Sequence, residues 1–98
     1  MSPSARRATV ERVQTGVRLE RRILGVLKAL ADLHGMTLGD LIEGMALHAF
    51  EGKPPFGADT LGRIRSLRDA FGLELTAADA HGLIEPKRAA LAKRRRRS

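Results

Sequence analysis

The stretch from Val13 to Phe50 reads VQTGVRL, then ERRILGVLKALADLH, then GMT, and finally LGDLIEGMALHAF. Its first seven residues alternate in polarity, which is the periodicity of a β-strand. A single strand of this length is not stable alone, because its backbone groups need a partner strand. A second copy of the chain is the simplest partner. The stretch therefore predicts a homodimer in which two strands form an antiparallel ribbon around a two-fold axis.

The alternation divides the predicted strand, residues 10–19, into two faces. One face is apolar or neutral and is expected to pack against helices: Val13, Thr15, Val17 and Leu19. The opposite face points outward and is expected to meet a ligand: Arg12, Gln14, Gly16 and Arg18. Gly16 is the weak point of this outward face, because it has no side chain and weakens a strand.

Helical periodicity begins at Glu20 and predicts two amphipathic helices. The first carries the apolar stripe Ile23, Val26, Leu27, Leu30 and Leu33. Gly35 is expected to end it in a left-handed conformation, and Thr37 with Asp40 is expected to cap the next helix. The second stripe is Leu38, Leu41, Ile42, Met45, Ala46 and Ala49, and the predicted helix stops at Gly52 and the Pro54-Pro55 pair.

The remainder predicts an appended helical hairpin. Its first helix begins at Ala58 or Asp59 and ends at Gly72, with the stripe Leu61, Ile64, Leu67 and Phe71. A second Thr-x-x-Asp cap, Thr76 to Asp79, predicts a short helix that carries Ala80, Leu83 and Ile84. This hairpin either adds to the core, extends the dimer interface or binds a protein partner through residues 58–85, because an apolar stripe has to be covered.

Charge is distributed unevenly over the 98 residues, which have a net charge of +7 and no Cys. Residues 1–28 carry seven Lys/Arg and two acidic residues, residues 29–86 four and nine, and residues 87–98 seven and none. The basic ends favour an anionic partner, nucleic acid before an acidic membrane surface. A simple excess of solvated arginine is the alternative. No secretory signal and no apolar run near the ~20 residues of a membrane helix are present, so a cytoplasmic, nucleoid-associated protein is expected.

The outward face of the strand has the chemistry needed to read DNA. Arg forms paired hydrogen bonds with guanine and Gln with adenine in the major groove, which admits a two-stranded ribbon. Behind it, the amides at the start of the second helix, Thr37, Leu38 and Gly39, are placed to bind a phosphate. An ordinary helix cap at Thr37 would have the same sequence. The run Arg94, Arg95, Arg96 and Arg97 is expected either to track phosphates nonspecifically or only to solubilise the chain.

This order of strand, helix, Gly-x-Thr turn and helix resembles the ribbon-helix-helix family of DNA-binding proteins, of the Arc, MetJ and CopG type. The residues that carry the resemblance are Val17-Arg18-Leu19, the stripe Ile23 to Leu33, Gly35-Met36-Thr37 and Asp40-Leu41-Ile42. The resemblance implies a dimeric repressor that reads bases with Gln14, Gly16 and Arg18, and contacts phosphates with Thr37, Leu38 and Gly39. Two departures are Gly16, where the family has a polar side chain, and the start Glu20-Arg21-Arg22, which lacks a common capping residue.

The sequence thus predicts a mainly α protein: a ribbon-helix-helix with one N-terminal strand paired across a homodimer, plus a C-terminal helical extension. The expected parts are a disordered basic arm (1–11), the DNA-binding domain (12–52), the helical hairpin (53–86) and a basic tail (87–98). Sequence-specific binding of double-stranded DNA, with repression of transcription, is the expected function. The alternatives are an antitoxin whose region after residue 55 binds a toxin, and a plasmid or conjugation accessory protein. No enzyme motif stands out, and no cofactor is expected. No metal site is expected either, because His34, His48 and His81 lack the spacing of metal ligands.

Overall fold

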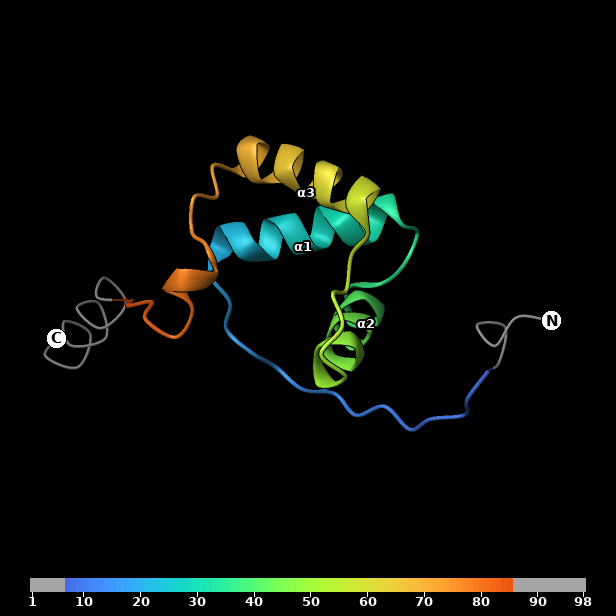
Figure 1. Cartoon of the computed structure of the whole chain (residues 1–98). Helices are drawn as coiled ribbons and strands as arrows, with labels where there is room; N and C mark the ends of the chain where they lie inside the picture. The colour runs from blue at the N-terminus through green and yellow to red at the C-terminus, as the bar shows by residue number, and fades with distance from the viewer. Residues whose placement is uncertain (1–6, 86–98) are drawn as a thin grey trace, which may run out of the picture.

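The computed structural model describes residues 7–85 and contains three α-helices and one short turn of 3₁₀-helix. The helices are α1 (Arg21–Leu33), α2 (Leu38–Phe50) and α3 (Ala58–Phe71), and the 3₁₀ turn η2 is Ala77–Asp79. Figure 1 shows α3 running back beside α1, with α2 crossing below the pair and the N-terminal segment leaving the start of α1. The mainly α fold class is confirmed.

The N-terminal segment, residues 7–19, is elongated and has no regular secondary structure. Within residues 7–85, no backbone hydrogen bond joins this segment to another part of the chain. The predicted ribbon strand is therefore not seen in a single chain. Pairing between two copies stays a prediction, since a ribbon across a dimer would need the second chain.

Local capping explains where the first two helices begin and end. Glu20 caps α1 with its side chain, which accepts hydrogen bonds from the amides of Arg22 (2.9 Å) and Ile23 (3.0 Å). Gly35 follows α1 with a φ of 64°, and the amide of Met36 donates to Ala31, as in a Schellman motif. The Thr37 hydroxyl accepts from the amide of Asp40 at 3.0 Å and begins α2. The predictions at Gly35 and Thr37 are confirmed, and Glu20 supplies the cap that was missing from the sequence pattern.

The hydrophobic core forms where α1 meets α2 and α3. Its buried members are Val26, Leu30, Ala31, Leu41 and Leu73, and Leu27, Met45, Phe56, Ile64 and Leu67 pack around this centre. Several members of the predicted stripes are instead exposed: Leu33 (52%), Ile42 (39%), Ala49, Leu61 (44%) and Phe71 (43%). The predicted stripe of α3 does add to the core through Ile64 and Leu67.

A glycine allows α3 to approach α1 closely. A Cβ atom added to Gly25 would lie 2.7 Å from Cε1 and 2.8 Å from Cδ1 of Phe71, closer than real Cβ contacts. The ring of Phe71, the last residue of α3, therefore occupies the space that a side chain at position 25 would need. Arg22 adds a polar contact at the same end, donating from Nη1 to the carbonyl of Gly72 at 3.2 Å.

The prediction of a second helix in the hairpin, after Thr76, is wrong. The cap forms, with the amide of Thr76 donating to Asp79 at 2.8 Å, but only one 3₁₀ turn follows it. Ala80 is extended (ψ 141°) and His81 has a φ of 68°, so the backbone leaves helical conformation before Leu83 and Ile84. Both of these side chains are exposed. The extension is thus one helix packed on α1, followed by a turn.

Candidate nucleic-acid interface

The four predicted base-reading residues lie on the extended N-terminal segment and are all exposed. Gly16 has open space around it, since a Cβ there would meet nothing within 4 Å. The other face of the segment is exposed as well, with Val13 at 77% and Val17 at 73%. The segment therefore offers polar side chains outward and leaves its apolar side chains uncovered within one chain.

Arg12 is not free. Its Nε and Nη2 atoms donate to Oε2 and Oε1 of Glu43, both at 2.8 Å, and Nη2 lies 3.4 Å from Oδ1 of Asp40. The hydrogen bond and the charge of Glu43 raise the pKa of Arg12, and the same hydrogen bond lowers the pKa of Glu43. In the single chain Arg12 thus joins the segment to α2, and its predicted contact with DNA stays a prediction.

Arg18 is also paired, with a carboxylate far along the chain. Its Nη2 atom donates to Oε2 of Glu85 at 2.6 Å, across 67 positions of sequence. Residues 83–85 lie against residues 18–21 around a shallow hollow. Both side chains keep about 60% of their surface exposed, so solvent screens this pair.

At the start of α2, where the phosphate site is predicted, one of the polar groups is already hydrogen-bonded within the chain. Thr37 spends its hydroxyl on the amide of Asp40. The amides of Leu38 and Gly39 have no acceptor among residues 7–85, as expected for the first turn of a helix. A Cβ on Gly39 would meet only the Thr37 hydroxyl, at 3.9 Å, so this end is open to a ligand. Asp40 does not return the predicted capping-box bond and turns instead to Arg12.

The structure brings Arg12 of the predicted strand close to the start of α2, two sites that were predicted separately from the sequence. Arg12 from the extended N-terminal segment lies beside Asp40, in the first turn of the helix that is predicted to bind phosphate. Arg18 is instead held beside the end of the described chain. Arg94 to Arg97 lie outside the described residues. Glu43 and Glu85 were missed by sequence reasoning, because their partners are 31 and 67 residues away.

Charge and burial also set the acid–base behaviour of the α1 cap. Burial raises the pKa of Glu20, but hydrogen bonds from the Ile23 amide and from Arg22 outweigh this and lower it overall.

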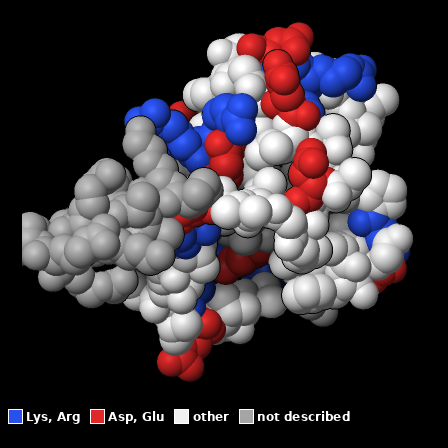
Figure 2. All heavy atoms as spheres, turned by 90° about the vertical axis from the view of Figure 1, so that its left-hand side faces the viewer, with Lys and Arg blue, Asp and Glu red and all other residues white. Residues whose placement is uncertain are grey.

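Figure 2 shows acidic and basic side chains interspersed over the visible part of one face. No helix within residues 7–85 is both long and apolar enough to cross a membrane.

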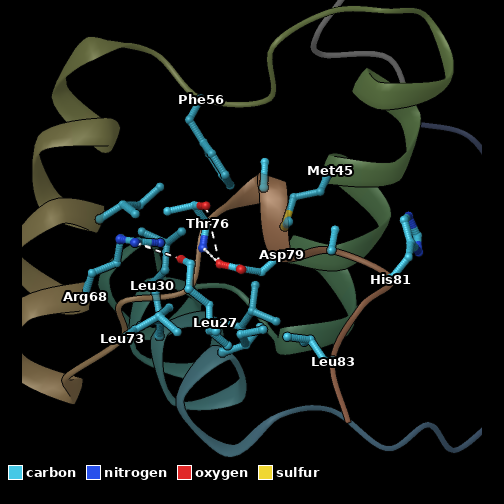
Figure 3. A pocket seen from close by; sticks show the side chains of 16 residues that line it. Leu27, Leu30, Met45, Phe56, Arg68, Leu73, Thr76, Asp79, His81 and Leu83 are labelled. Atoms are coloured by element: carbon cyan, nitrogen blue, oxygen red, sulfur yellow. Dashed lines mark hydrogen bonds between the residues drawn. The ribbon is translucent and has the colours of Figure 1, made fainter.

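A mostly apolar cavity of about 470 Å³ lies where the 77–79 turn approaches α1, α2 and α3 (Figure 3). Two of its polar members bond to the backbone: Arg68 donates to the carbonyl of Leu75 at 2.8 Å, and Asp79 accepts from the amide of Thr76. His34 and His48 line a second hollow beside Met36 and Phe56, and His48 Nδ1 lies 2.8 Å from the carbonyl of Gly44. Among residues 7–85, no three potential metal ligands come together.

Comparisons with known proteins return no match, whether with family models, with curated proteins or with solved structures.

Proposed function

We propose that this protein is a homodimeric, sequence-specific binder of double-stranded DNA, of ribbon-helix-helix type, and that it represses transcription. The extended N-terminal segment, residues 7–19, would serve as the reading segment. The reading segments of two chains would pair as an antiparallel ribbon and enter the major groove. Gln14 and Arg18 would contact bases, with Gly16 allowing close approach, while Thr37, Leu38 and Gly39 would contact phosphate. Arg94 to Arg97 would add nonspecific contacts to the backbone.

The observation that carries the proposal is the state of residues 7–19. The segment is elongated, lacks backbone hydrogen bonds to the rest of residues 7–85, and joins α1 directly at a side-chain cap. Exposed amides and carbonyls in a row form an edge that pairs readily with another strand. A second copy supplies a partner strand of identical sequence and length.

Uncovered apolar side chains on α2 support the same dimer. Leu47 and Phe50 are 64% and 81% exposed, on a helix that is apolar around most of its circumference. A helix of this kind is normally buried. Val13 and Val17 are exposed as well, and in the proposed dimer a second chain would cover these four side chains. The free energy would come from the apolar area removed from water.

Binding of a protein partner through residues 58–85, as in an antitoxin, has less support. Ile64 and Leu67 pack inside the molecule, so the α3 stripe is largely used by the chain itself. A plasmid or conjugation accessory role has the same DNA chemistry and would differ only in the site that is bound.

The experiment is selection of bound duplexes from a random DNA pool at stated salt, combined with light scattering of the free protein. We expect a palindromic site and the mass of a dimer. Phe50→Ser should shift the dimer toward monomer, because Phe50 is 81% exposed in the single chain and would be covered in the dimer. A monomer at micromolar concentration, or a pool that shows no enrichment, would refute the proposal.

A further inference from the structure

Arg12 and Glu43 make the most complete side-chain ion pair in the described residues. Two parallel N–H to O bonds of 2.8 Å join the guanidinium to the carboxylate, and Asp40 adds a third contact at 3.4 Å. Paired geometry of this kind is the exception among exposed ion pairs, because a rigid fork meets a carboxylate without much further ordering. The pair connects the start of the extended segment to the second turn of α2.

These contacts use the atoms that a base reader would need. Arginine reads guanine with two adjacent donors, and here Nε and Nη2 are both bonded to Glu43. Arg12 would have to leave two carboxylates before it could contact a base. Arg18, by contrast, makes one bond with Glu85.

Building on the proposed DNA-binding function, we propose that Arg12 and Glu43 form a clasp that holds the reading segment against α2. Arg12 is then a positioning residue and does not read bases. Base recognition falls to Gln14 and Arg18, and the clasp sets where these side chains stand relative to the phosphate site at the start of α2.

The clasp has a second consequence for that phosphate site. Asp40 belongs to the first turn of α2 and Glu43 to the next, so two carboxylates stand close to the amides that would bind a phosphate. Alone, they would repel the phosphate and oppose the positive end of the helix dipole. Arg12 offsets one of these two negative charges in place, which lessens the repulsion of a phosphate at the amides of Leu38 and Gly39.

Glu43→Gln gives a test in which the two roles of Arg12 predict opposite signs. Removing a negative charge should by itself strengthen DNA binding, and releasing a base-reading arginine should strengthen it further. If the clasp positions the segment, Glu43→Gln should instead weaken binding to the selected site by about two- to fivefold, the upper range for an exposed pair. Glu74→Gln is the matched control: it removes the same charge from an exposed residue that forms no ion pair within residues 7–85.

Two further variants separate the outcomes. Arg12→Gln should weaken binding as much as Glu43→Gln while leaving the selected base preferences unchanged, and the exchange Arg12→Glu with Glu43→Arg should restore affinity. Tighter binding by Glu43→Gln, loss of preference at one base pair of each half-site by about fivefold or more in Arg12→Gln, or an exchange variant as weak as Arg12→Glu alone would overturn the clasp.

A titration without DNA distinguishes failure of the clasp from failure of the proposed function. Carboxyl NMR of the free protein should show that Glu43 titrates at lower pH in the unmodified chain than in Arg12→Gln. Equal titration in both proteins would overturn the clasp whether or not DNA is bound. A Glu43 signal that does respond to Arg12, in a protein that selects no DNA, would uphold the contact between segment and helix and refute its part in DNA binding.

Discussion

Gly25→Ala is the substitution that best tests how the C-terminal extension is attached. In an isolated helix the change stabilises, by about 0.5–1 kcal/mol, because alanine loses less backbone entropy than glycine. Here the added Cβ would lie 2.7 and 2.8 Å from two ring carbons of Phe71. The ring has to move, and it is 43% exposed, so it has a route toward solvent.

The size of the effect follows from the area that the ring has buried. Somewhat more than half of Phe71 is covered, which is roughly 110 Å² for a phenylalanine and at ~25 cal/mol/Å² sets an upper limit of about 3 kcal/mol. Losing most of this contact, less the gain in helix propensity, leaves a net destabilisation of about 1–2 kcal/mol. The loss of contact therefore outweighs the propensity gain.

The assay is urea denaturation followed by circular dichroism, at one protein concentration so that dimer formation affects all samples equally. Gly62→Ala in α3 is the matched control, because its Cβ would meet only the end of Arg65 at 3.9 Å. It should be as stable as the original chain or about 0.5–1 kcal/mol more stable. In a Phe71→Ala background the penalty of Gly25→Ala should vanish. If Gly25→Ala is as stable as Gly62→Ala, α3 does not pack on α1 through this ring.

Three further predictions concern the core, the acid limit and Arg18. Leu30→Ala should cost about 3–5 kcal/mol in urea denaturation, because Leu30 is 2% exposed and its loss leaves a cavity between the helices; a cost below 1 kcal/mol would refute the core as described. Folding lowers the pKa values of Glu20 and Glu43. The two carboxylates therefore stabilise the fold fully above the ordinary glutamate pKa of 4.5, and this stabilisation is lost as pH falls through their folded-state pKa values. Glu43→Gln should lessen this acid sensitivity in thermal melts at pH 3–5. Glu85→Gln should tighten binding to the selected DNA by up to about fivefold, more than Glu74→Gln, because Arg18 loses a competing carboxylate; equal effects of the two would show that Glu85 acts only through net charge.

The part of the fold that sequence reasoning predicted well is set by neighbours in the chain. Gly35 and Thr37 end α1 and begin α2 through bonds that span five residues or fewer, and Gly72 ends α3 with a φ of 65°. Glu20 was not predicted as a cap, since glutamate is an uncommon residue there. The helix after Thr76 failed to form although its cap did, because a cap adds about 1 kcal/mol and does not hold a short helix whose apolar residues Leu83 and Ile84 stay largely exposed.

Composition and periodicity alone predicted the three helices and the alternating pattern of the basic segment before them, and they led us to expect a partner for that segment. Only the tertiary structure decided that α3 lies on α1, that Gly25 makes room for Phe71, and that Arg12 faces Glu43 while Arg18 faces Glu85. The physical reason is the distance along the chain over which each kind of interaction acts. Capping and amphipathic patterning act within a few residues, whereas ring packing and ion pairing depend on which distant side chains the folded backbone brings within reach. The outward face that looked uniform in the sequence is thereby divided between Arg12, which is joined to α2, and Arg18, which is joined to Glu85.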